Sequence, residues 1–195
     1  NRTTADVVRG PNADNPSGTN MTLIFRNTGG SVKDLKVIRP GYDPINPPLF
    51  TKEFLQHIER FKVLRFMEWL RTNQNTATTW ESRALPSRRH MGAGGVPWEH
   101  VIALANQTQK DIWINIPVGA NDGYMTELTK LLKSTLNSTS KIYIEYSNKL
   151  WNSQFKQYFT NRDLATSELL NNPNSVLAYD GKTHVDTLGY RRIAK

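Results

Sequence analysis

The residues best suited to chemistry in this 195-residue chain follow a strand-like stretch. Residues 142–146 are rich in β-branched and aromatic types, which favour strands. A polar turn with Ser147, Asn148 and Lys149 comes next, followed closely by Trp151. The end of a barrel strand delivers side chains to a pocket in this way. An amide and an indole in such a place suit the binding of a polar ligand such as a sugar, whereas Lys149 is expected to be a solvated or salt-bridged residue at the end of the strand.

A second stretch with chemical potential covers residues 62–69, which alternate as a strand and end in Glu68 and Trp69. Arg65 in this stretch and Glu145 in the central one carry opposite charges. We expect them to pair inside the fold if both face the pocket. The alternative is that one of the two faces helices or solvent.

Three tryptophans are candidate platforms for stacking against a sugar, although aromatic residues in strands more often belong to the core. Trp151 is favoured as a platform over Trp69 and Trp113 because it lies beyond its strand. The chain has no cysteine and its four histidines lack metal-ligand spacing, so we expect neither a metal nor another cofactor. The candidate binding residues are Arg65, Glu68, Trp69, Asn148 and Trp151.

Alternating strands and helices must position these residues. Apolar runs predict strands over residues 62–69, 112–118 and 141–147, with a helix between successive strands. This order favours a parallel sheet with right-handed crossovers, in which the three strands are neighbours. Thr51 and Asp122 are expected to cap the first and third helices, Pro97 is expected in the first turn of the second helix, and a fourth helix is expected over residues 155–170.

The front of the chain differs from the rest. Residues 21–26 and 32–38 are predicted strands around a glycine turn, and two strands alone need a larger sheet to join. We therefore divide the chain into a fragment of a β-sheet domain with its linker (1–41) and an α/β domain (42–195). The polar loop 73–95 is long enough to shape a site.

Four stretches resemble, in order and spacing, the barrel strands and a helix of secreted glycoside-hydrolase-like proteins with a (β/α)8 barrel. The last of them, residues 143–148, is similar to the fourth-strand motif of a retaining clan in which the strand ends in Asn-Glu. The resemblance implies an α/β fold made of a partial (half) TIM-type barrel, preceded by a piece of a small β domain similar to residues 32–41. The four stretches are residues 61–69, 101–106, 112–117 and 143–148.

The resemblance also implies a site, and this chain departs from it. In the clan the Asn contacts the sugar 2-hydroxyl and the Glu is the general acid/base. Asn148 matches the Asn, but Lys149 stands where the Glu belongs, and the nucleophile strand has no counterpart because only the first half of a barrel is expected. An ammonium with a reference pKa of about 10.4 is a poor proton donor at neutral pH. Retaining hydrolysis needs two carboxyl groups.

Charge and sequons bear on partners and location. The formal charge of +8 is spread along the chain without a nucleic-acid motif, so we expect no nucleic acid as partner. A polysaccharide or an anionic matrix fits the charge equally well. No apolar run is long enough for a membrane span. Asn-X-Ser/Thr sequons at Asn20, Asn106 and Asn137 are candidate glycosylation sites and agree with secretion to the extracellular space; a fourth begins at Asn1.

These observations lead to a secreted glycoside-hydrolase-like glycoprotein that has lost catalysis. It is expected to serve as a structural or carbohydrate-binding component of an extracellular assembly, with other chains completing the barrel. The alternative is a fragment of an active retaining glycoside hydrolase completed by another chain, against which Lys149 argues. A basic protein of a mineral or polysaccharide matrix is a third interpretation, and it differs from the first only in its partner.

Overall fold

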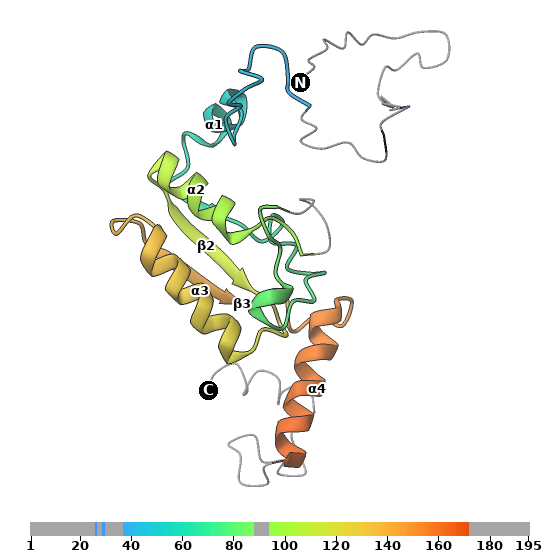
Figure 1. Ribbon diagram of the computed structural model, residues 1–195. Helices are drawn as coiled ribbons and strands as arrows, with labels where there is room; N and C mark the ends of the chain where they lie inside the picture. Colours follow the sequence, from blue (N-terminus) through green and yellow to red (C-terminus); the bar gives the residue numbers. More distant parts are fainter. Residues whose placement is uncertain (1–25, 27–28, 30–36, 88–93, 172–195) are drawn as a thin grey trace. The chain divides into compact units, whose positions relative to one another are not determined.

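The computed structural model describes Arg26, Gly29 and residues 37–87 and 94–171 (Figure 1). The chain divides into two compact units, residues 1–49 and residues 50–195. The strands predicted over 21–26 and 32–38 fall almost wholly outside the described residues. Arg26, Val37 and Ile38 are described and lie in no strand. The second unit contains the sheet and the helices that surround it.

The second unit is a mixed α/β structure built on a parallel sheet. Its three described strands lie in the order β1-β2-β3, and both neighbouring pairs are parallel. The predicted parallel arrangement of the three stretches is therefore confirmed. The strands are β1 (Val63–Arg65), β2 (Asp111–Ile116) and β3 (Ile142–Tyr146).

Helices connect and cover these strands, and most of their caps follow the sequence. The Thr51 side chain accepts a hydrogen bond from the Phe54 N–H at 3.3 Å, as predicted for an N-cap. For the third helix the cap is Asn121, one residue before the predicted Asp122, and its Oδ1 accepts from Tyr124 N–H at 2.8 Å. The described helices are α1 (Lys52–Ile58), the short 3-10 helix η1 (Trp80–Ser82), α2 (Trp98–Thr108), α3 (Asp122–Thr135) and α4 (Lys156–Asn171).

The core lies between β2 and the helices α2 and α3, which cover the same face of the sheet (Figure 1). Apolar residues three and four apart on both helices face inward, as their spacing predicts. Successive residues of a strand point to opposite faces, so every second residue of β2 points at these helices. This explains why the three isoleucines at alternate positions of β2 are all buried. The main core residues are Ile112, Ile114, Ile116, Val101, Leu104, Ala105, Leu128 and Leu132.

The first strand is shorter than predicted, because it ends at Arg65 and not at Trp69. After Phe66 the backbone turns in a helical manner. Leu70 N–H donates to the Phe66 carbonyl at 2.8 Å, and Thr72 N–H donates to the Met67 carbonyl at 3.1 Å. These local hydrogen bonds replace the ladder, so the strand prediction was wrong for its last residues.

One buried hydrogen bond joins α2 to α3 and can be tested. Trp98 Nε1 donates to the Tyr124 hydroxyl at 2.7 Å, and both residues are buried. Tyr124→Phe should lower the free energy of unfolding by about 1–2 kcal/mol at pH 7, because the indole N–H stays buried without an acceptor. Urea unfolding measures this, with Tyr143→Phe, which removes an exposed hydroxyl, as control. Equal stability of Tyr124→Phe and wild type would contradict the assignment.

The same residue gives an alkaline signature. Burial raises the pKa of Tyr124 above its ordinary value, with the hydrogen bond from Trp98 acting in the opposite direction. A group whose pKa is raised by folding stabilises the protein fully below its unfolded pKa, about 10 for Tyr, and this contribution is lost as pH rises through the folded value. As pH rises above about 10, the free energy of unfolding should therefore fall less in Tyr124→Phe than in wild type.

Candidate polar site at the strand ends

The face of the sheet opposite α2 and α3 carries the polar candidates. Residues paired across parallel strands point to the same side, and Arg65 pairs with Trp113 while Asn115 pairs with Glu145. Tyr143, the partner of Trp113 on β3, shares this side. We call this set of five residues the open face. Trp113 is 39% exposed, so the helices that bury the other side of β2 leave this side accessible.

The centre of the open face is the carboxylate of Glu145. Its Oε2 accepts hydrogen bonds from Arg65 Nη2 at 2.8 Å, Trp113 Nε1 at 3.0 Å and Asn115 Nδ2 at 2.8 Å. The predicted pair of Arg65 with Glu145 is therefore confirmed. Because both side chains are about one-third exposed, solvent screens the pair and it contributes at most about 1 kcal/mol. The main effect of the Glu145 carboxylate is to hold four side chains from three strands together, its own and those of Arg65, Trp113 and Asn115.

The tryptophan of the open face is held on two sides. Its indole N–H is engaged by Glu145, and the Arg65 guanidinium lies 4.9 Å from the ring centroid. Such a cation–π contact is worth about 0.5–1 kcal/mol at an exposed position. Trp113 is thus a rigid, partly exposed aromatic surface next to a fixed charge.

A buried amide network anchors the turn after β3. Asn115 Nδ2 also donates to the Ser147 carbonyl at 2.7 Å. Asn148 is buried, and its Nδ2 donates to Asn73 Oδ1 at 3.0 Å. Gln157 Nε2 donates to the same Asn73 oxygen at 2.7 Å and to the Asn148 carbonyl at 2.8 Å. The predicted site residue Asn148 is therefore near the cluster, but its amide N–H is bonded within the protein.

Lys149 stands outside this network, at the surface. Its backbone has a φ of 48°, in the left-handed region, while the neighbouring Asn148 and Leu150 are buried. The side chain is exposed, and its Nζ lies 5.2 Å from the ring centroid of Phe155. Two buried neighbours thus fix the backbone of Lys149 and leave its ammonium group in solvent.

The remaining predicted residues separate into two groups. Trp151 is 65% exposed and is the most accessible tryptophan of the described chain. Trp69 instead packs against the rings of Phe50, Phe54 and Phe66, with centroid distances of 6.3, 5.6 and 5.5 Å. Trp69 therefore extends the core and is not an exposed surface for stacking against a sugar.

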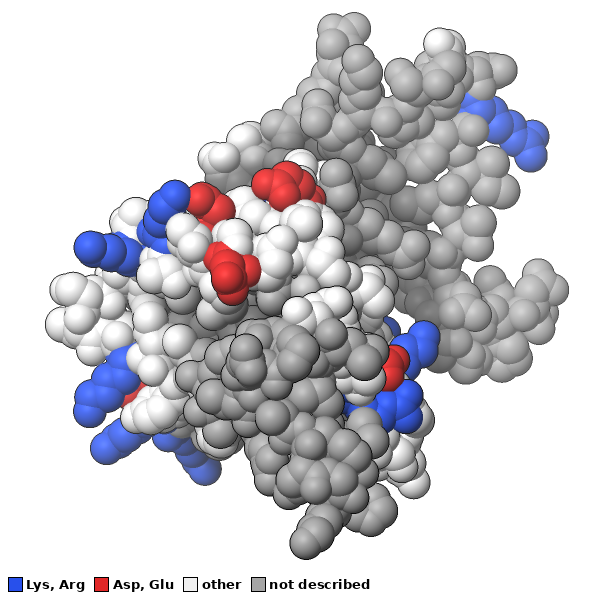
Figure 2. All heavy atoms as spheres, turned by 90° about the horizontal axis from the view of Figure 1, so that it is seen from below, with Lys and Arg blue, Asp and Glu red and all other residues white. Residues whose placement is uncertain are grey.

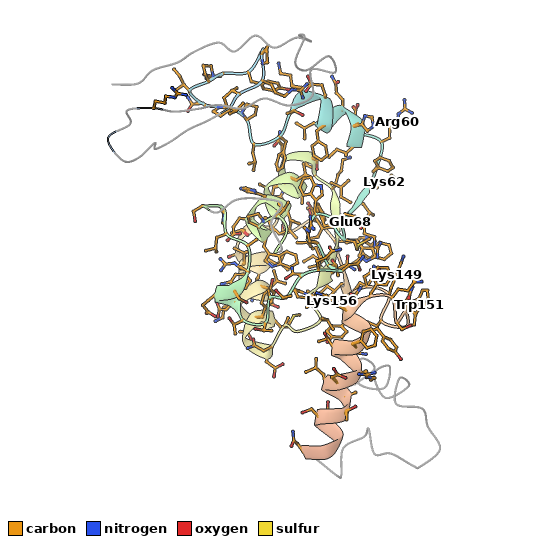
Figure 3. All side chains as sticks on the ribbon, turned by 90° about the vertical axis from the view of Figure 1, so that its right-hand side faces the viewer. Arg60, Lys62, Glu68, Lys149, Trp151 and Lys156 are labelled. Atoms are coloured by element: carbon orange, nitrogen blue, oxygen red, sulfur yellow. The ribbon has the colours of Figure 1, made fainter. Side chains whose placement is uncertain are left out.

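Figure 3 places the exposed candidates. Arg60, Lys62, Lys149 and Trp151 lie on the same side of the ribbon, away from α2 and α3, and Glu68 lies in the turn beyond β1. Glu68 is exposed and stands beyond the strand because β1 ends at Arg65. The face drawn in Figure 2 shows the described basic side chains in separate groups with acidic ones beside some of them, not as one continuous basic surface.

Sequence reasoning missed three amides of the site. Asn115 could have been found, because it lies two residues after Trp113 in a predicted strand and so shares its face. Asn73 and Gln157 carry no such signal, since they lie 84 residues apart and meet only in the fold. Within residues 37–87 and 94–171 no group of three or more His, Cys, Asp or Glu side chains is arranged to hold a metal ion. No described helix is long and apolar enough to span a membrane.

Two of the predicted sequons contact each other. Asn137 N–H donates to Asn106 Oδ1 at 2.8 Å, and Asn106 Nδ2 donates to the Thr135 carbonyl at 2.7 Å. Asn137 itself is exposed. In protein secreted from a eukaryotic host, we expect Asn137→Gln to lose a full glycan mass and Asn106→Gln to change the mass little. The Asn106 amide donates at 2.7 Å to the Thr135 carbonyl, whereas the Asn137 amide makes only a 3.5 Å contact with the Asn106 carbonyl. Intact mass spectrometry measures this, and an unmodified Asn137 would contradict it. Asn20 lies outside the described residues.

Comparisons with protein-family models, with curated proteins and with solved structures find no match to this chain.

Proposed function

We propose that this chain is the first half of a glycoside-hydrolase-like (β/α)8 barrel that binds carbohydrate outside the cell without hydrolysing it. The observation that carries the proposal is the arrangement at the carboxyl ends of three parallel strands. Arg65 at the end of β1 and Glu145 near the end of β3 hold the partly exposed Trp113, which lies in the middle of β2, and the turn after β3 presents an exposed Trp151. Ligand sites of parallel α/β sheets are built at these strand ends.

The chemistry favours binding over turnover. A retaining glycosidase needs one carboxyl group as general acid/base and a second as nucleophile, about 5–5.5 Å apart. At the position of the first, this chain presents the ammonium of Lys149, whose charge opposes the oxocarbenium-like transition state. The Glu145 carboxylate binds three donors of the protein and positions Arg65 and Trp113. Stacking and hydrogen bonding to a sugar remain available.

The edge of the sheet supports completion by another chain. On β3 the residues that share the helix side of the sheet are poorly covered, since Ile142 is 39% and Ile144 62% exposed. In a barrel, a further strand would pair with β3 and its helix would cover these side chains. A parallel edge with exposed isoleucines therefore suits a partner that supplies the next strand–helix unit.

Sugar binding through Trp151 predicts a specific loss of affinity. Trp151→Ala should weaken binding of any oligosaccharide found on a glycan array by about 3- to 10-fold, since an aromatic contact is worth about 0.5–1.5 kcal/mol beyond its buried area. Titration calorimetry measures the change. Phe159→Ala is the matched control, because Phe159 is an exposed aromatic residue on α4 that packs against Tyr158 and Arg162. Equal losses in both variants would count against a sugar site at the strand ends.

A further inference from the structure

Basic side chains without acidic partners flank the open face. Arg60, Lys62 and Lys149 lie on the same side of the molecule (Figure 3). All three are exposed, and none forms an ion pair with a described residue. On the open face itself, the Glu145 carboxylate is already paired with Arg65. Against these three cations stands the exposed carboxylate of Glu68 in the turn beyond β1, so the charge that these four residues leave for a ligand is net positive.

Lys149 combines a fixed backbone with an uncommitted charge. Its neighbours on both sides are buried, and its contact with the Phe155 ring is a weak exposed cation–π interaction. An anion that approaches from solvent can replace this contact at little cost. Two residues further on, Trp151 exposes most of its ring. The turn thus presents an ammonium group and an exposed tryptophan two residues apart.

We propose that the ligand of this site is an acidic glycan and that Lys149 recognises its carboxylate or sulfate groups. The proposal depends on the carbohydrate-binding function and specifies its ligand class. The lysine that removes the general acid of the resembled hydrolases thereby gains a binding role, because an ammonium repels a developing oxocarbenium ion but attracts a uronate or a sulfate ester. Nucleic acid is the less favoured polyanion, since single-strand binding requires a continuous basic groove with successive stacking rings.

The test compares matched ligands on the full chain. The probes are an oligogalacturonate hexamer, the same hexamer with its carboxyl groups reduced to alcohols, and a sulfated derivative of the reduced hexamer. Wild type should bind at least one anionic hexamer about tenfold tighter than the reduced one, as one charge-assisted contact predicts, and the preference should shrink as NaCl is raised from about 50 to 500 mM. The two anionic probes separate carboxylate from sulfate recognition.

Variants then assign the preference to Lys149. Lys149→Glu should remove the preference for the anionic hexamer and change the affinity for the reduced hexamer by less than about twofold. Lys149→Arg should retain the preference. Lys133→Glu, the same charge change at an exposed site in the last turn of α3, is the control and should retain the preference. Circular dichroism confirms that each variant is folded.

The outcomes distinguish the two proposals. Equal affinity for all three hexamers would overturn the acidic-glycan inference and leave carbohydrate binding in place, whereas no binding of any hexamer would overturn both. Tighter binding of an oligo-dT than of either anionic hexamer, weakened by Lys149→Glu, would replace the glycan with nucleic acid. A preference that survives Lys149→Glu would show that other residues recognise the anion.

Discussion

Gly95→Ala should destabilise the second unit by about 3 kcal/mol or more. Gly95 has a φ of 75°, which non-glycine residues rarely adopt, and an added Cβ would lie 2.5 Å from the Trp69 carbonyl oxygen and 2.6 Å from the Leu70 carbonyl carbon. Both are backbone atoms that cannot rotate away. Overpacking of this kind and the dihedral strain each cost about 1–3 kcal/mol. The contact matters because the adjacent Val96 N–H donates to the same Trp69 carbonyl at 2.8 Å, which docks the loop against the turn after β1.

Urea unfolding monitored by tryptophan fluorescence measures this effect. Gly94→Ala is a closely matched control, because its Cβ would meet Ala84 at ordinary distances of 3.4–3.8 Å. We expect this control to change the free energy of unfolding by less than about 1 kcal/mol. An unchanged midpoint for Gly95→Ala would show that the loop is not docked as described.

Asn115→Asp should be the most damaging isosteric change at the site. Asn115 is buried, and its Nδ2 donates to Glu145 Oε2 at 2.8 Å and to the Ser147 carbonyl at 2.7 Å. The variant places a carboxylate against two acceptors without altering volume. We expect a loss of about 2–4 kcal/mol at pH 7, because two donors vanish and a charge is buried. Asn152→Asp is the control, since its oxygen still accepts from Gln154 N–H.

The damage should depend on pH with a defined sign. Burial beside Glu145 raises the pKa of the introduced carboxyl in the folded state above its unfolded value of about 3.9. Below its unfolded pKa the introduced carboxyl is neutral and can donate a hydrogen bond, so the variant is destabilised least there. As pH rises through the folded pKa the carboxyl ionises, and the folding stability of the variant falls. The stability gap between variant and wild type should therefore be smaller at pH 4 than at pH 7. A gap that widens on acidification would contradict the network.

The sequence predicted the sheet because its strands are apolar runs separated by amphipathic helices, a signal that local chemistry carries. It did not predict the end of β1, where the hydrogen bond from Leu70 N–H to the Phe66 carbonyl competes with the ladder. The role of Trp69 could not be predicted from the sequence either. Its packing against Phe50 and Phe54 in the folded chain shows that it belongs to the core and is not an exposed stacking surface.

The candidate site was predictable in part for a related reason. Arg65 and Glu145 carry opposite charges and lie on β1 and β3, the two strands on either side of β2, so the strand pattern allowed them to meet across β2. Asn73 comes from a loop and Gln157 from a helix. The sequence pattern of neither element predicts that these two side chains contact each other. The amide network that holds Asn148 in place could therefore be found only in the folded chain.

Binding without hydrolysis can be measured on the bound sugar itself. The protein is saturated with an oligosaccharide that it binds, incubated, and the sugar is recovered and analysed by chromatography, in parallel with Lys149→Ala and Lys149→Glu. We predict saturable binding by wild type and recovery of intact oligosaccharide from all three proteins, because in the proposed half barrel the strand that carries the nucleophile of the resembled hydrolases has no counterpart. Cleavage by wild type that Lys149→Ala abolishes would contradict the account and make Lys149 a catalytic residue.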